Sequence, residues 1–195
     1  MNKVVIFDFD KTLTYQDTLS GFYFEISREK SFRIIRHLIY FLFEVGYALK
    51  LISNDALKRA GVKLFLNGIP FNRYQSCCVK YGTKIQLNPT VLRLLRKREK
   101  EGYEIWILSA SFEDYIKSAL NVNVQGSKLQ VDGGRVIGLE SNNFGRIKRS
   151  FVLSHFKDRS VKEFYTDHVS DFEAASLAES VFMVRGNSIE EIKLK

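Results

Sequence analysis

Short apolar runs alternate with helical patterns along this chain. Four runs are rich in β-branched or aromatic residues and stop at polar residues: Val4–Phe7, Tyr103–Leu108, Lys162–Tyr165 and Val181–Val184. Such continuous runs are typical of parallel strands that are buried on both faces of a sheet. The pattern therefore predicts an α/β fold, with a doubly wound, Rossmann-like and mainly parallel sheet.

The helical patterns are longest in the first half of the chain. Between residues 14 and 88 no segment has a convincing strand pattern, so this part is expected to be helical. Other expected helices cover 89–98, 113–120 and 146–156, with one more running from after Asp167 through Glu179. A short strand is expected at 122–124, a hairpin through Gly133-Gly134 joins 128–131 to 135–139, and the tail after Val184 is polar.

The segment 32–52 has an unusual pattern. Its polar residues Arg33, Arg36, His37 and Glu44 fall on one narrow face of a helix, and apolar residues cover nearly everything else. A helix this apolar is normally buried or in contact with lipid, but charges interrupt it too often for a membrane-spanning helix. Two interpretations remain open: a central helix of a small bundle, or a helix that lies on a membrane surface.

The candidate chemistry lies where the predicted strands end. Asp8 and Asp10 follow the first strand two residues apart, so their side chains point the same way. Ser109 follows the second strand, and Asp167 follows the third with Asp171 four residues later. In a doubly wound sheet these positions share the edge where ligands bind.

This set suits phosphomonoester hydrolysis. A carboxylate can attack phosphorus and form an aspartyl-phosphate, and a second acid can protonate the leaving group. Mg²⁺ with oxygen ligands would neutralise the phosphoryl charge, while a hydroxyl, backbone amides and a lysine hold the phosphate oxygens. Lys148, at the start of a predicted helix, is the best candidate for that lysine.

The charge and the cysteine content limit the classes of binding partner and the cellular compartment that we expect. The 195 residues carry a net charge of +8, from 30 basic and 22 acidic side chains, which favours anionic partners. No signature of a small nucleic-acid-binding fold is present, so no nucleic acid is expected. The adjacent Cys77 and Cys78 provide neither a disulfide framework nor a zinc site, and the N-terminus has no secretory signal. We therefore expect a cytoplasmic protein, with membrane association as the alternative raised by 32–52.

Four segments in order, DFDKTLT, ILSAS, Lys148 and TDHVSD, resemble the motifs of the haloacid dehalogenase superfamily of phosphatases. The phosphoserine-phosphatase-like branch is the most similar. The resemblance implies a catalytic core of residues 1–14 and 89–195, with a helical C1-type cap of residues 15–88 inserted after the first motif. Dehalogenating members lack the second aspartate of the first motif, since a halide leaving group needs no proton, so the presence of Asp10 favours a phosphate over a halide substrate.

The resemblance also implies a role for each matching residue. Asp8 resembles the nucleophile and Asp10 the general acid/base. The phosphate-binding residues are expected to be Ser109, Ala110, Lys148 and Thr12. The Mg²⁺ ligands are expected to be Asp8, Asp10 through its backbone carbonyl, Asp167 and Asp171.

The substrate is less well defined. Thr166, His168 and Ser170 depart from the fourth motif of phosphoserine phosphatases, and Asp17 stands where those enzymes carry a glutamate near the substrate amine. The motifs are also similar to those of phosphatidylglycerophosphate phosphatases. We expect a small phosphorylated metabolite or a lipid-linked phosphate. The alternatives are a phosphotransferase, or a protein that binds membrane surfaces through 32–52 on a phosphatase scaffold.

Overall fold

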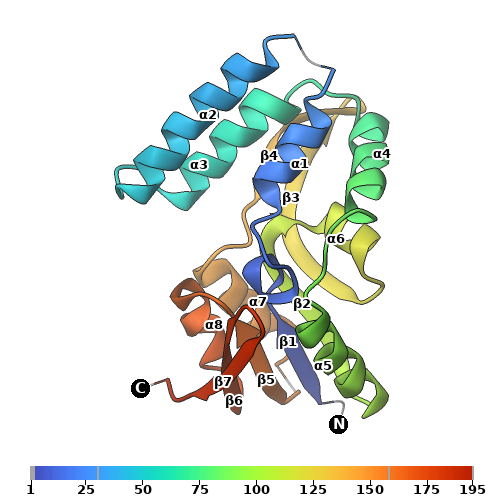
Figure 1. Ribbon diagram of the computed structural model, residues 1–195, viewed down its shortest axis with the longest axis vertical. Helices are drawn as coiled ribbons and strands as arrows, with labels where there is room; N and C mark the ends of the chain where they lie inside the picture. Colours follow the sequence, from blue (N-terminus) through green and yellow to red (C-terminus); the bar gives the residue numbers. More distant parts are fainter. Residues whose placement is uncertain (1–2, 30, 158, 195) are drawn as a thin grey trace.

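The computed structural model describes residues 3–29, 31–157 and 159–194 and is built on one seven-stranded sheet (Figure 1). The strand order is β4-β3-β2-β1-β5-β6-β7. The strands are β1 (Val4–Phe7), β2 (Glu104–Phe112), β3 (Asn123–Asp132), β4 (Arg135–Ser141), β5 (Val161–Thr166), β6 (Ser180–Arg185) and β7 (Ser188–Ile192). The five central strands pair in parallel and the two edge strands pair antiparallel. This confirms the predicted α/β fold.

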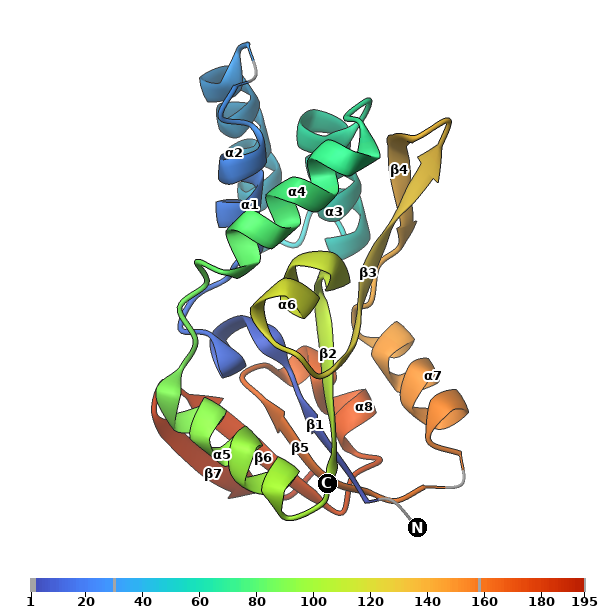
Figure 2. The same ribbon diagram turned by 90° about the vertical axis from the view of Figure 1, so that its right-hand side faces the viewer.

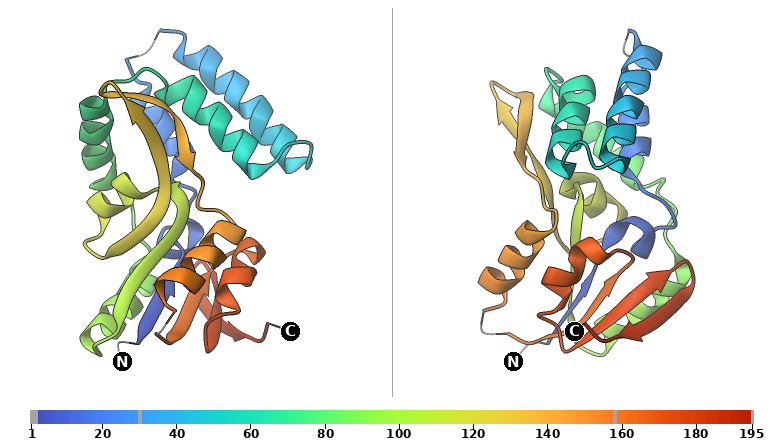
Figure 3. Two further views of the ribbon diagram at one scale, coloured as in Figure 1. Left: turned by 180° about the vertical axis from the view of Figure 1, so that it is seen from behind. Right: turned by 90° about the vertical axis from the view of Figure 1, so that its left-hand side faces the viewer.

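Helices cover both faces of the sheet (Figures 2 and 3). They are α5 (Pro89–Lys100) and α6 (Glu113–Ala119) on one face, and α7 (Arg146–His155) and α8 (Phe172–Ala175) on the other. Side chains of β1 alternate between the faces, as the strand period requires. Val5 and Phe7 belong to the core cluster that contains Leu95 of α5, whereas Val4 and Ile6 belong to the cluster that contains Val152 of α7. The first strand is therefore buried on both sides.

Four further helices lie beyond the carboxyl ends of the strands (Figure 1). They are α1 (Leu19–Ile26), α2 (Arg33–Ala48), α3 (Asn54–Gly61) and α4 (Phe71–Gly82). The β3–β4 hairpin reaches up to this helical group. Backbone hydrogen bonds join Gly68 N to Val136 O at 2.8 Å and Phe71 N to Gly134 O at 2.9 Å. The helical group and the sheet are thus tied together at a second place besides the chain connections.

The structure corrects several predicted boundaries. β2 continues through Phe112 instead of stopping at Ser109, and β3 is one strand that pairs first with β2 and then, from Lys128 on, with β4. The tail forms β7, an antiparallel edge strand. Its polar residues face solvent, so the sequence pattern gave no sign of a strand. The helix expected after Asp167 is reduced to a 3-10 turn at Val169–Asp171 and the four residues of α8.

Helix α2 is not the centre of a bundle. Tyr40 is its one buried residue, while Ile34, Leu38 and Leu42 are 72%, 60% and 67% exposed. The bundle interpretation of 32–52 is therefore wrong, because the polar face of the helix packs inward and the apolar face points outward. Within the described ranges, no helix has both the length and the apolarity needed to cross a bilayer.

Close packing of α4 on α6 requires a glycine at the end of α4. A Cβ at Gly82 would lie 2.5 Å from Tyr115 O and 2.6 Å from Ser118 Cβ. We expect Gly82→Ala to lower the free energy of unfolding by about 1–3 kcal/mol, because the backbone of α6 must shift. Chemical denaturation measures this change.

Gly46, inside α2, is the matched control for that substitution. A Cβ there would have Ile52 Cγ1 as its nearest neighbour, at 3.8 Å. Gly46→Ala should leave stability unchanged or raise it by about 0.5–1 kcal/mol, since alanine favours helix. Equal losses in the two variants would argue against the close contact of α4 and α6.

Candidate active site

A buried lysine lies between two aspartates at the centre of the site. Lys148 Nζ is 2.6 Å from Asp8 Oδ1 and 2.8 Å from Asp171 Oδ2, and all three residues are buried. Asp8 follows β1, Lys148 lies in the first turn of α7, and Asp171 ends the 3-10 turn after β5. Thr166 Oγ1 donates to Asp171 Oδ2 at 3.0 Å. Three elements distant in sequence therefore meet in one charged cluster.

Burial dominates the electrostatics of this cluster. It raises the pKa of Asp8 well above its ordinary value, and the nearby Lys148 offsets only part of the effect. Burial alone would lower the pKa of Lys148, but attraction to Asp8 and Asp171 raises it. Lys148 is therefore firmly protonated, and its single positive charge is shared between two carboxylates.

Asp10 is held by four hydrogen bonds. Its Oδ1 accepts from Thr18 N at 2.7 Å and Thr18 Oγ1 at 2.6 Å. Its Oδ2 accepts from Ser111 Oγ at 2.6 Å and from Ser109 Oγ at 3.5 Å. The donors come from the entrance to α1 and from β2, so the carboxylate is fixed between the sheet and the helical group.

Ser109 and Thr12 lie beneath the surface of the site. Both are fully buried, and neither lines the cavity beside Asp8. Ser109 Oγ accepts from Ser111 N at 3.0 Å, and the hydroxyl of Thr12 has no hydrogen-bond partner within the described residues. Ala110, between the two serines of β2, does line the cavity.

Five aspartates line one cavity together with Lys148: Asp8, Asp10, Asp17, Asp167 and Asp171. Burial also raises the pKa of Asp167. As the side chains stand, no group of three or more His, Cys, Asp or Glu in the described parts of the chain could by itself hold a metal ion. Mg²⁺ does not need such a group, because it usually keeps several waters and few carboxylate ligands. The oxygen-rich, acidic lining fits that ion.

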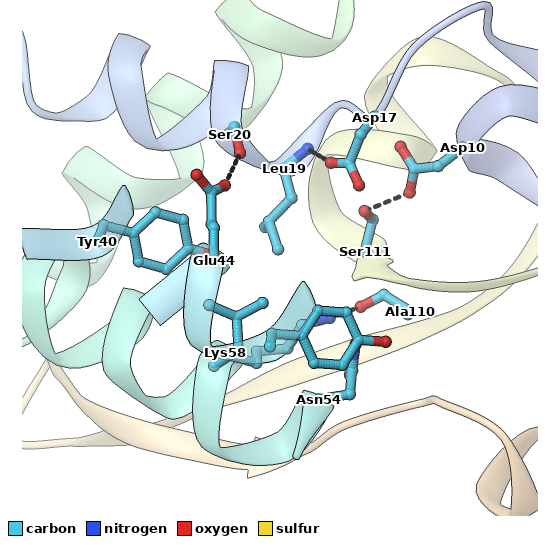
Figure 4. A pocket seen from close by; sticks show the side chains of 12 residues that line it. Asp10, Asp17, Leu19, Ser20, Tyr40, Glu44, Asn54, Lys58, Ala110 and Ser111 are labelled. Atoms are coloured by element: carbon cyan, nitrogen blue, oxygen red, sulfur yellow. Dashed lines mark hydrogen bonds between the residues drawn. The ribbon is translucent and has the colours of Figure 1, made fainter. Parts of the chain in front are cut away.

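A second cavity adjoins the first, and both are lined by Asp10, Asp17 and Ala110. Figure 4 shows it between α1, α2, α3 and β2, with Tyr40 and Glu44 facing Asp10 and Asp17 across it. Lys58 of α3 is 3% exposed and points across the cavity floor to the carbonyl oxygen of Ala110. Burial lowers the pKa of Lys58 to about 8, although Asp10 and Asp17 counteract the effect.

Comparison with known proteins gives the family. The sequence model of the haloacid dehalogenase-like hydrolases matches residues 5–176. The chain belongs to this family. The predicted superfamily and enzyme class are thereby confirmed, and the chain is a hydrolase. No curated protein matches the chain.

Solved structures share the fold of this hydrolase at low sequence identity. A phospho-aspartyl intermediate analogue of phosphoserine phosphatase matches with a TM-score of 0.63 at 18% identity, covering 92% of this chain and 85% of the other. Phosphoserine phosphatase from T. onnurineus gives a TM-score of 0.62 at 21% identity, with 93% and 82% covered. A protein of unknown function from Bordetella pertussis Tohama I gives 0.76 at 14% identity, with 93% and 89% covered.

Three polar residues of the hydrolase site were missed from sequence. Ser111 could have been found, because it lies two residues after Ser109 on the same face of a strand. Thr18 and Lys58 gave no readable signal, since the positions that bring them to Asp10 and Ala110 depend on the packing of α1 and α3.

The buried charge of Lys58 predicts a pH-dependent stability difference. Below pH 8 Lys58 is protonated in both the folded and unfolded chain, and the cost of burying its charge is fully present. As pH rises towards 10.5, the ordinary value, the folded chain is already neutral at this residue and the cost disappears. The free energy of unfolding of Lys58→Met minus that of wild type should therefore be about 3 kcal/mol larger at pH 7 than at pH 10.5.

Denaturant titrations of both proteins at the two pH values, in metal-free buffer, measure this difference. Lys63→Met serves as the control, because Lys63 is an exposed lysine five residues further along the chain, just after α3. Its effect should not depend on pH. A Lys58→Met effect that is equally independent of pH would contradict the buried charge.

Proposed function

We propose that this hydrolase cleaves phosphomonoesters through an aspartyl-phosphate on Asp8. The observation that carries the proposal is the cavity in which Asp8 and Asp10, after β1, and Asp167 and Asp171, after β5, meet the protonated Lys148. Membership of the haloacid dehalogenase-like hydrolases supports the same chemistry.

Asp8 is proposed as the nucleophile. Its carboxylate attacks phosphorus, and the bond between phosphorus and the ester oxygen breaks. Lys148 Nζ, at 2.6 Å from Asp8 Oδ1, keeps the carboxylate in place and attracts the phosphate oxygens. Raising the pKa of a carboxylate also makes it a more basic nucleophile, provided that a cation keeps it ionised.

Asp10 is proposed as the acid/base. It gives a proton to the departing alkoxide and later accepts one from the water that cleaves the aspartyl-phosphate. The hydrogen bonds from Thr18 and Ser111 keep its carboxylate from turning away from the ester oxygen. Ser109, Ala110 and Thr12 are proposed to shape the phosphate-binding loop, with Ala110 nearest the cavity.

Asp8, Asp167, Asp171 and the backbone carbonyl of Asp10 are proposed to hold Mg²⁺. The ion would neutralise charge on the phosphoryl oxygens. Support comes from the carboxylates that line this cavity, since oxygen ligands are those that Mg²⁺ prefers.

We propose residues 15–88 as a cap that selects the substrate, with 1–14 and 89–195 as the catalytic core. The second cavity lies between α1, α2, α3 and the core, beside the proposed phosphate site, so it is suited to the organic part of the ester. Tyr40, Leu57 and Glu44 give it a mixed apolar and charged lining. A small phosphorylated metabolite or a lipid-linked phosphate fits this lining, and the fold shared with phosphoserine phosphatases supports a small substrate.

The nucleophile is tested by Asp8→Asn. Turnover of p-nitrophenyl phosphate should fall about a thousandfold or more, because an amide cannot form the covalent intermediate. Asp132→Asn, which removes a negative charge in the exposed hairpin, should leave turnover unchanged. Turnover in Asp8→Asn that persists at the level of Asp132→Asn would contradict the proposed mechanism.

The metal site is tested by removing the ion and one of its proposed ligands. Chelation with EDTA should abolish turnover and added Mg²⁺ should restore it. Asp167→Asn should raise the Mg²⁺ concentration for half-maximal activity about tenfold or more. The control is Glu173→Gln, because Glu173 is an exposed residue of α8 whose partner is Arg146 of α7. Full activity in EDTA would rule out the metal.

A further inference from the structure

Helix α2 exposes an apolar surface that the protein itself does not cover. We define the outer face of α2 as the exposed apolar side chains of this helix and its two ends: Phe32, Ile34, Ile35, Leu38, Ile39, Phe41, Leu42, Phe43, Val45, Leu49 and Leu51. Exposed apolar residues that occur singly are ordinary, but a contiguous set of this size marks an interaction surface.

The polar side of α2 is the side that packs against the protein. His37 Nε2 lies 3.0 Å from Ser27 Oγ, and Ser20 Oγ donates to Glu44 Oε1 at 3.0 Å. Arg36 donates to the carbonyl oxygen of Leu64, and the ring of Tyr40 packs on those of Tyr23 and Phe65. This reverses the usual arrangement of a surface helix, whose apolar stripe faces the core.

The width of the outer face favours a flat apolar phase over a second helix. At 100° per residue, the apolar arc from Phe41 to Ile39 covers about 160° of the helix surface. The seam along which two helices pack, as in a coiled coil, is narrower than the stripe of about 100° or more that a surface helix turns toward a core. A second copy of this chain docked through α2 alone would therefore leave apolar side chains in water, whereas hydrocarbon would cover all of them.

The segment that carries α2 is basic. Residues 15–88 contain eleven lysines and arginines against five aspartates and glutamates, so this segment carries +6 of the net +8. Two of its acidic residues form ion pairs: Glu29 pairs with Arg73 and Asp55 with Arg59. Lys50, next to Leu49 and Leu51, has no carboxylate partner within the described ranges.

We propose that the outer face of α2 binds the surface of anionic phospholipid membranes. The helix lies along the interface, with its apolar side chains among the acyl chains and Lys50, just after its C-terminal end, near the headgroups. Its 16 residues correspond to about 24 Å, short of the roughly 30 Å of the hydrocarbon core, so it rests on the membrane without crossing it.

Membrane binding and the proposed reaction share α2 but do not depend on each other. Tyr40, Glu44 and Tyr47 on the inner side of the helix line the second cavity, whereas the outer face takes no part in it. Binding would hold the cavity close to the membrane surface, where phosphate esters with apolar tails are found.

The proposal is tested by flotation with vesicles of equimolar phosphatidylcholine and phosphatidylglycerol. The full chain should float with these vesicles, and less well with phosphatidylcholine alone. The double variant Leu38→Glu/Leu42→Glu, at the middle of the outer face, should lose about tenfold or more in partitioning, because two leucines that would enter the acyl chains are exchanged for charges.

A matched control places the same changes elsewhere. Val79→Glu/Leu153→Glu alters two exposed apolar residues of α4 and α7 and should float like the wild type. Asp8→Asn should also float like the wild type. Turnover of a water-soluble ester by Leu38→Glu/Leu42→Glu should be unchanged, which separates loss of membrane binding from loss of folding or of catalysis.

Two outcomes would overturn the proposal. In the first, flotation does not depend on the outer face: either the wild-type protein stays in the bottom fraction, or the Leu38→Glu/Leu42→Glu variant floats as well as wild type. The other is seen by sedimentation velocity without vesicles: a wild-type dimer that this variant converts to a monomer, with no flotation, would assign the outer face to a second copy of the chain.

Discussion

The contact of Lys148 with Asp8 and Asp171 is the constraint around which the site is built. A lysine that is 2% exposed loses the hydration of its charge, and only well-placed carboxylates can offset that cost. Both aspartates accept from its ammonium group within 2.8 Å. Through these two ion pairs Lys148 holds α7 against the ends of β1 and β5. Removing the lysine would leave two buried carboxylates that repel each other, so the contact stabilises the site only when all three residues are present.

The helical group adds the second part of the site. Phe22 of α1 packs on Tyr115 of α6 with ring centroids 5.0 Å apart, and Tyr81 of α4 donates to the carbonyl oxygen of Thr18 at 2.7 Å. These contacts fix the entrance to α1, and through Thr18 they fix the carboxylate of Asp10. Packing between helices and sheet thus sets the position of a residue to which we assign proton transfer.

Much of the core was predictable because its signals are local. The apolar run before Asp8 is buried on both faces, and topology alone places the ends of parallel strands at one edge. The side chains of Asp8, Asp10 and Asp167 line one cavity for this reason. Their catalytic and metal-binding roles remain predictions.

The parts that were not predictable depend on contacts between distant segments. The pattern of α2 is compatible with either orientation of its apolar face, and only the partners of His37 and Glu44 decide which face turns inward. Lys58 is one lysine among eleven basic residues of its segment, and its burial follows from the position of α3 over Ala110. β7 has the composition of a solvated tail and is a strand because β6 offers it an edge.

The central claim is that a phosphoryl group resides covalently on Asp8 during turnover. Quenching the enzyme during steady-state turnover and reducing it with borohydride converts an aspartyl-phosphate to homoserine, which peptide mass spectrometry assigns to a position. The account predicts homoserine at position 8 and at none of positions 10, 167 and 171. Homoserine at another aspartate, or turnover that leaves every aspartate unmodified, would contradict it.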